Sequence, residues 1–246
     1  MSTPATSSVT MSKLLSRHEV AERTMAFRFE KPSGWTFKAG QVIAMTLLGP
    51  SETDAEGDTR EFSIASGPHE DTLMVATRLR DTAFKRVLQT LPLGTAVKIE
   101  GPSGTLTLHT DVKRSAVFLA GGIGITPFRS MLLRAAQEQL PHRIFLFYSN
   151  RRPEDAPFLE ELQALGRMNP RYTLIASMTD MGKSHQSWRG ETGQITAAML
   201  ARYLKNAGSP IYYIAGPPGM VKGLHAMVHE SGVDDADIRA EEFAGY

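Results

Sequence analysis

The residues with the clearest chemical pattern lie at 116–128, in the sequence AVFLAGGIGITPF. The first five are small or apolar and predict a short buried strand, and FRSMLLRAAQ at 128–137 predicts an amphipathic helix. A glycine turn between a strand and a helix directs backbone N–H groups at a bound phosphate. Gly122 and Gly124 are present, but Pro127 stands where the G-x-G-x-x-G pattern has its third glycine. The spacing alone leaves open a phosphate-binding turn or an ordinary strand-to-helix turn.

A second pattern is REFS at 60–63. In a strand, Arg60 and Phe62 share one face and Ser63 points to the other. A guanidinium binds phosphate oxygens in bidentate fashion, and an aromatic side chain covers a flat ring. The pattern therefore suits a cofactor with a diphosphate and a flat ring. A barrel strand with an exposed arginine and a core phenylalanine is the other interpretation.

Two further turns are less specific. In GPSGTL at 101–106, Gly104 and Thr105 offer backbone N–H groups and a hydroxyl to a phosphate, although a plain glycine–proline turn fits equally well. The segment FKAGQV at 37–42 is a turn that leads into a buried strand. By itself it carries no functional information.

Two kinds of element must position these residues. Up to residue 108 the pattern is short strands, at 14–20, 24–29, 41–48, 60–65, 72–79, 96–100 and 105–108, with one helix at 83–89. Such spacing predicts a β-barrel or sandwich. From residue 113 onward, strands at 116–120, 144–148, 172–177 and 211–215 alternate with helices at 128–137, 157–165, 196–205 and 219–231. This alternation predicts a parallel sheet with helices on both faces.

The sequence thus predicts three parts: a loose tail at 1–10, an all-β domain at 11–110 and an α/β domain at 113–246. A formal net charge of +1 argues against a nucleic-acid partner. The absence of cysteine excludes disulfides, cysteine-ligated iron–sulfur clusters and thiolate zinc sites in this sequence, and the seven histidines show no metal-ligand spacing. No apolar run approaches the roughly 20 residues of a membrane span, and the first ten residues lack signal-peptide features. We therefore expect a cytoplasmic protein.

Five motifs follow one another in a fixed order: FxAGQ at 37–41, RxFS at 60–63, GPxG at 101–104, GGIGITP at 121–127 and AGPPGM at 215–220. In this order, and with an all-β domain before an α/β domain, the chain resembles the ferredoxin–NADP(+) reductase superfamily over residues 12–246. The resemblance implies an FAD-binding β-barrel followed by an NAD(P)H-binding α/β domain. The flavin would lie between the two domains.

The resemblance assigns roles in the barrel residue by residue. Arg60 would bind the FAD diphosphate, and Phe62, where the family usually has tyrosine, would pack on the isoalloxazine. Ser63 would lie close to the flavin N5, which accepts hydride. The resemblance also places Thr77 and Arg78 along the flavin.

The diphosphate is expected to meet Gly104 and Thr105. Many relatives carry a Gly-x-x-Ser or Gly-x-x-Thr phosphate turn before the next helix. This chain has RDTAFK at 80–85 instead, so that contact stays open.

In the α/β domain, the glycine turn would receive the phosphates and ribose of the nicotinamide nucleotide through Gly122, Gly124 and Thr126. Gly216 and Pro217 match a site near the nicotinamide that usually begins with cysteine, where this chain has Ala215. Hydride transfer between two rings depends mainly on their positions and on exclusion of water. The missing thiol is therefore compatible with catalysis.

The nucleotide could be NADPH or NADH. Ser149 and Arg151, at the end of the second strand of the α/β domain, favour the 2′-phosphate of NADPH. Glu154 and Asp155 lie close by and weaken this preference, because an acidic side chain usually holds a ribose diol.

The C-terminus is the last family-like feature. Plant-type members end in an aromatic residue that covers the second flavin face and moves when nicotinamide stacks. Phe243 is the first candidate and Tyr246 the second, and a frayed tail is the alternative.

The resulting hypothesis is an FAD-dependent oxidoreductase with Ser63 and Phe243 at the reacting rings. It would take hydride from NAD(P)H, with NADPH favoured, and pass single electrons to a separate ferredoxin or flavodoxin. One alternative is the reductase subunit of a multicomponent oxygenase or of a membrane redox complex. Another is a non-catalytic nucleotide-binding module, which the phenylalanine and alanine departures support.

Overall fold

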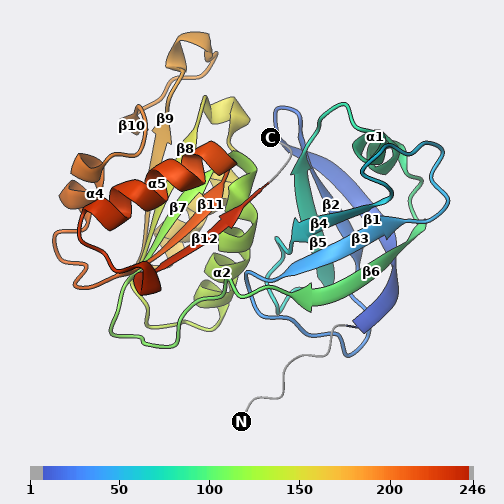
Figure 1. Ribbon diagram of the computed structural model, residues 1–246, viewed down its shortest axis with the longest axis horizontal. Coiled ribbons are helices and arrows are strands. Elements are labelled where there is room, and N and C mark those ends of the chain that lie inside the picture. Colours follow the sequence, from blue (N-terminus) through green and yellow to red (C-terminus); the bar gives the residue numbers. More distant parts are fainter. Residues whose placement is uncertain (1–7, 244–246) are drawn as a thin grey trace.

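The computed structural model describes residues 8–243, which form two six-stranded sheets lying side by side (Figure 1). The first sheet is antiparallel, with strand order β4-β3-β6-β1-β2-β5. Beyond the end of β4, the N–H of Ala65 donates a 2.8 Å hydrogen bond to the carbonyl of Met74 in β5, so the two outer strands meet and the sheet is barrel-like. Its strands are β1 (Ser8–Ala21), β2 (Thr24–Glu30), β3 (Val42–Leu47), β4 (Thr59–Ser63), β5 (Thr72–Arg78) and β6 (Ala96–Ser103).

The barrel core follows from the two-residue repeat of its strands. In β3, for example, Ile43, Met45 and Leu47 are buried and alternate with half-buried residues. Helix α1 (Ala83–Thr90) adds Phe84, Val87 and Leu88 to this core. The N-cap residue of the helix is Thr82.

The second sheet is parallel, with strand order β10-β9-β8-β7-β11-β12. Its strands are β7 (Ala116–Gly121), β8 (Ile144–Asn150), β9 (Tyr172–Met178), β10 (Glu191–Thr192), β11 (Ile211–Gly216) and β12 (Ile238–Glu242). Every residue of β7 and β11 is buried, which explains their continuous apolar runs. A β-barrel followed by an α/β parallel sheet is the fold class that the sequence predicts, and it is confirmed.

Helices cover both faces of the parallel sheet. Helices α2 (Ile125–Gln137) and α3 (Leu159–Met168) pack on one face, where the ring of Phe118 stacks on that of Phe128 with centroids 4.6 Å apart. Helices α4 (Ala197–Tyr203) and α5 (Pro218–Glu230) pack on the other. Figure 1 shows α2 between the parallel sheet and the barrel. Within residues 8–243, no helix has the length and apolarity needed to cross a bilayer.

Helix α2 joins the two sheets directly. The Arg129 guanidinium donates a 2.5 Å hydrogen bond to the carbonyl of Ala65, and the Ser130 hydroxyl donates a 2.6 Å bond to that of Ser66. Arg129 is also paired with Glu161 of α3 at 2.7 Å. The segment that follows β4 is therefore held by the α/β domain.

Some predicted elements differ from the structure. Residues 105–108 were expected as a strand but form none, because Gly104, with a φ of +93°, turns the chain away from the barrel. Helix α2 begins at Ile125 rather than at Phe128, since the one-turn helix η1 (Gly122–Gly124) leads straight into it. Strands β10 and β12 were not predicted.

Candidate active site

A line of adjoining cavities follows the junction between the two domains. The barrel cavity, of about 560 Å³, extends into a smaller hollow of about 90 Å³ that shares six of its residues. β4, the start of α1 and the end of β12 supply most of its walls. Its shared lining is Arg60, Glu61, Phe62, Ser63, Lys85 and Phe243.

Ser63 lies in this cavity as the sequence predicts. It is only 3% exposed, and its hydroxyl has no hydrogen-bond partner among the described residues. A buried hydroxyl without a partner is uncommon in a folded protein and indicates a missing ligand or water. The polar edge of a flavin ring would satisfy it.

Phe62 lies both in the barrel core and at the cavity, so its position is compatible with a core phenylalanine and with an aromatic that covers a flat ring. Its side chain is 8% exposed and belongs to the barrel core, with its ring centroid 5.9 Å from that of Phe84. It also lines the barrel cavity. Phe84 therefore supports the residue that would contact a flat ring.

The Arg60 guanidinium is turned toward the acidic loop that precedes β4. Its Nη1 donates to the carbonyl oxygens of Glu56, Gly57 and Thr59 at 3.0, 2.8 and 2.8 Å. Its Nη2 lies 3.0 Å from a carboxylate oxygen of Asp54 and 3.0 Å from one of Glu56. Arg60 thus lines the cavity while its guanidinium is paired with the carboxylates of Asp54 and Glu56.

Lys85 is a cavity residue that the sequence reading did not assign. It stands in the first turn of α1, beside the N-cap Thr82, and both line the barrel cavity. Burial, with the neighbouring charges of Arg80 and Arg60, lowers the pKa of Lys85 to about 8. Within residues 8–243, the ammonium group has no hydrogen-bond or ion-pair partner.

Of the four other barrel residues expected to contact the flavin, two line the cavity and two do not. Thr77 and Arg78 line the small hollow, next to Ser63. Gly104 and Thr105 are exposed and line none of the cavities described here, although a Cβ on Gly104 would lie 3.6 Å from Val42 of the barrel cavity. The structure therefore brings the first pair, and not the second, to the cavity.

Glu241 is a second residue that the sequence reading missed. It lines the barrel cavity with Ser63, and its Oε2 atom is buried without a hydrogen-bond partner among the described residues. Burial, with a smaller effect of the nearby Glu61 charge, raises the pKa of Glu241 to about 7. A carboxyl group that gains and loses a proton near neutral pH thus lies in the same cavity as the unpartnered serine.

Phe243 is the last residue that the structure describes, and it lines both parts of the barrel cavity. The first candidate for the C-terminal aromatic thus lies at this cavity, and its role over a flavin stays a prediction. Tyr246, the other candidate, lies outside the described residues.

The interdomain cavity, of about 490 Å³, continues from the barrel cavity through Arg78 and Arg80. Arg23 and Arg151 bring its lining to four arginines. Its lining carboxylate, Asp155, is paired with Arg152 and does not neutralise them. The cavity therefore favours an anionic ligand.

The expected nucleotide residues cluster here. Gly122, Ser149, Arg151 and Pro217 line the interdomain cavity, and Thr126 lines the hollow beside Ser63. Gly124 and Gly216 lie behind them: a Cβ on Gly124 would be 2.3 Å from the carbonyl oxygen of Ala215. Close backbone approach requires a glycine at 124, and its contact with a nucleotide stays a prediction.

Asn150 lies in the same cavity and was not predicted. It is 7% exposed, and neither its amide nitrogen nor its amide oxygen has a partner among residues 8–243. A ligand with both a donor and an acceptor would satisfy it.

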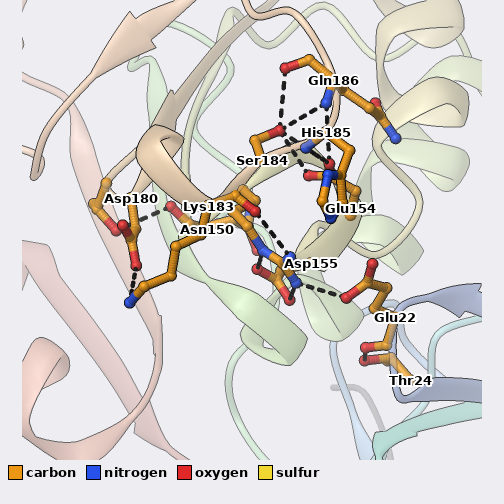
Figure 2. A network of polar contacts seen from close by, with 12 residues as sticks. Glu22, Thr24, Asn150, Glu154, Asp155, Asp180, Lys183, Ser184, His185 and Gln186 are labelled. Carbon is orange, nitrogen blue, oxygen red and sulfur yellow. Dashed lines mark hydrogen bonds and ion pairs between the residues drawn. The ribbon is translucent and has the colours of Figure 1, made fainter.

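The acidic residues expected to oppose NADPH are engaged elsewhere (Figure 2). The Glu154 carboxylate accepts hydrogen bonds from the Ser184 hydroxyl and from the N–H groups of His185 and Gln186, at 2.7–3.2 Å. Asp155 binds Arg152, which also pairs with Glu22 of the barrel at 2.6 Å. The Glu154 carboxylate therefore holds the loop at 184–186, and the Asp155 carboxylate holds the arginine that reaches the barrel.

A third cavity, of about 470 Å³, adjoins the second through Ser149, Thr179 and Met220. Apolar side chains of α5 supply much of its wall, including Leu224 and Met227. An apolar hollow next to an arginine-lined one suits a flat ring attached to phosphates.

Comparisons with known proteins agree with this geometry. A model of the oxidoreductase NAD-binding domain matches residues 118–226. The chain is 26% identical over 210 residues to reductase component 2 of terephthalate 1,2-dioxygenase from a Comamonas species, covering 85% of this chain and 60% of that relative. It is 27% identical over 230 residues to ferredoxin–NADP reductase B of Sorangium cellulosum, covering 90% of this chain and 91% of that relative.

A solved structure shares the fold. The ferredoxin–NADP(+) reductase of Neisseria gonorrhoeae, with bound FAD and NADP, superposes with a TM-score of 0.77 and 22% identity, covering 95% of this chain and 98% of that one. The chain thus spans nearly all of two of these proteins but only 60% of the dioxygenase reductase component.

Proposed function

Because the chain belongs to the ferredoxin–NADP(+) reductase superfamily, we propose that it is an FAD-dependent oxidoreductase that uses NAD(P)H to reduce a separate acceptor protein. The observation that carries the proposal is the continuity of the cavities. Arg78 lines both the barrel hollow that contains Ser63 and the interdomain cavity that contains the glycine turn. Two cofactors in these cavities would meet beside Ser63 and Phe243.

FAD, when bound, accepts a hydride as two electrons and releases single electrons. The residues of this chain position and shield the rings. The unpartnered Ser63 hydroxyl would bond to the polar edge of the flavin, and Phe62 would support one ring face. Phe243, which lines both parts of the barrel cavity, would shield the ring face there and would have to move for the nicotinamide to stack.

Glu241 is suited to hold the proton that accompanies flavin reduction. Its carboxyl group shares the cavity with Ser63 and has a pKa of about 7. A group with such a pKa exchanges protons efficiently near neutral pH. Glu241 would hold or release this proton at its own carboxyl group, in the cavity that Ser63 also lines.

For the nucleotide we favour NADPH. Ser149 and Arg151 line the arginine-rich cavity, and the carboxylates of Glu154 and Asp155 are held by other partners. A 2′-phosphate would gain from this positive surface, whereas a ribose diol lacks a free carboxylate among these four residues.

For the acceptor we favour a small ferredoxin or flavodoxin, which fits the nearly full-length match to a ferredoxin–NADP reductase. The reductase role in a multicomponent oxygenase is the second candidate, because the Comamonas relative is such a component. Binding of purified ferredoxin, flavodoxin and an oxygenase component would separate the two. The proposed location is the cytoplasm.

The direct test is an absorption spectrum of the purified protein after incubation with FAD, followed by anaerobic titration with NADPH and with NADH. We expect a yellow protein whose flavin absorption bleaches, at lower NADPH than NADH concentration. A protein that stays colourless after added FAD would refute the proposal and favour a nucleotide-binding module.

A further inference from the structure

Two cationic side chains that line the barrel cavity differ in whether they have ion-pair partners. Arg60 and Lys85 both line it, on β4 and on α1 respectively. The family resemblance assigns the flavin diphosphate to Arg60. The hydrogen bonds in the structure favour the other residue.

Arg60 is already neutralised. Both of its terminal nitrogens donate within the loop that precedes β4, and two carboxylates, of Asp54 and Glu56, lie 3.0 Å from Nη2. The Asp54 carboxylate also accepts a 3.1 Å hydrogen bond from the N–H of Ala83 at the start of α1. This loop therefore already bonds the arginine and the first N–H of the helix.

Lys85, unlike Arg60, has no carboxylate partner among the described residues. Among the described residues its ammonium forms no ion pair, although Lys85 is half-buried and lines the same cavity as Arg60 and Arg80. Glu56 is the carboxylate that acts on its charge, and it is bonded to Arg60. An unpaired cation next to two arginines is unfavourable unless an anion binds there.

From these contacts we infer that Lys85 is the residue that binds the flavin phosphate, and that Arg60 organises the loop beside it. Lys85 would then replace the phosphate turn that this chain lacks at residues 80–85, together with the hydroxyl of Thr82. The inference rests on the proposed flavin function and makes it specific. It predicts selectivity for FAD and FMN over riboflavin, which has the same ring and no phosphate.

The test is a fluorescence titration of flavin-free protein with FAD, FMN and riboflavin. Lys85→Met should weaken FAD and FMN at least tenfold and riboflavin less than twofold, whereas Lys85→Arg should keep most of the FAD affinity. Lys98→Met, which removes a half-buried lysine of β6 that does not line the cavity, is the matched control and should change neither affinity.

The wild-type protein provides a readout that does not depend on the folding of a variant. Since the pKa of free Lys85 is about 8, FAD affinity should fall above pH 8, by up to tenfold per pH unit, while riboflavin affinity should stay constant. In Lys85→Arg this pH dependence should vanish.

Two results would overturn the inference while leaving the proposed function intact. One is equal weakening of FAD and riboflavin in Lys85→Met, which would assign the lysine to packing. The other is full FAD affinity in Lys85→Met combined with its loss in Arg60→Met. A wild-type protein that binds no flavin at all would refute the proposed function itself, and this inference with it.

Discussion

The backbone N–H of Phe243 donates a 3.0 Å hydrogen bond to the carbonyl oxygen of Gly216. An aromatic residue that lines the barrel cavity is thereby tethered to the turn that leads into Pro217 and the interdomain cavity. Access of the nicotinamide to the flavin and binding of the nucleotide should therefore be coupled.

Removal of the Phe243 ring tests this coupling. Phe243→Ala should bind NADP(+) several-fold more tightly, because the nicotinamide no longer competes with an aromatic ring. Flavin fluorescence should rise, since a stacked ring quenches it. Phe243→Tyr keeps the ring and should behave like the wild type; unchanged fluorescence and affinity in Phe243→Ala would place the ring away from the flavin.

The protonation of Glu241 should appear in the stability of the flavin-free protein. Its pKa is 4.5 when exposed and about 7 in the fold, so the folded state binds the proton more tightly. The wild type should lose stability relative to Glu241→Gln as pH rises from 4.5 to 7, by at most about 3 kcal/mol, and the difference should level off above pH 7. Urea denaturation at pH 5, 6, 7 and 8 measures this; a constant difference would contradict the raised pKa.

Gly124 should not tolerate a methyl group. Its backbone, with φ of −60°, suits alanine, but the Cβ would lie 2.3 Å from the carbonyl oxygen of Ala215 and 2.6 Å from the nitrogen of Gly216. Gly124→Ala should therefore destabilise the fold by about 3 kcal/mol, as overpacking against a backbone does. Gly223→Ala, in the open middle of α5, is the matched control and should gain about 0.5–1 kcal/mol.

Arg151 should determine the choice of nucleotide. Arg151→Gln removes a charge from the interdomain cavity, so KM for NADPH should rise about tenfold while KM for NADH changes less than twofold. Steady-state kinetics with both nucleotides measures this. Arg171→Gln, an exposed arginine outside the cavities, is the control; an equal effect of Arg151→Gln on both nucleotides would count against recognition of a 2′-phosphate.

Arg129 should contribute strongly to stability. It is buried, binds the carbonyl of Ala65 and pairs with Glu161. Arg129→Met leaves those oxygens without a donor, and we expect a loss of about 3 kcal/mol in chemical denaturation. The double variant Arg129→Met/Glu161→Gln should recover part of the loss; no recovery would show that the pair itself contributes little.

The sequence predicted the larger elements well because their periodicity is strong. Continuous apolar runs identified β7 and β11, and the alternation with helices identified the parallel sheet. It missed β10, which has only two residues, and β12, whose IRAEE has little apolar pattern. The false strand at 105–108 has an alternating pattern but no neighbouring strand to pair with.

The site was only partly predictable for a different reason. Glycines and aromatics can be recognised by type and spacing, as Gly122 was, whereas Ser63 was assigned through the family resemblance. The importance of Lys85, Asn150 and Glu241 depends on burial and on missing partners, which only the folded chain determines. Thr82 was also missed, although a threonine before an amphipathic run is a recognisable helix N-cap.

The contacts of α2 with Ala65 and Ser66 come from the residues directly after Ser63. If the barrel separated from the α/β domain, these two hydrogen bonds would break. The backbone after Ser63, which helps to shape the barrel cavity, would then lose its support. Heating should therefore produce a single calorimetric peak, with equal calorimetric and van't Hoff enthalpies, although the chain contains two separate sheets. In thermodynamic terms the molecule behaves as one cooperative unit, and its cofactor sites persist or vanish together.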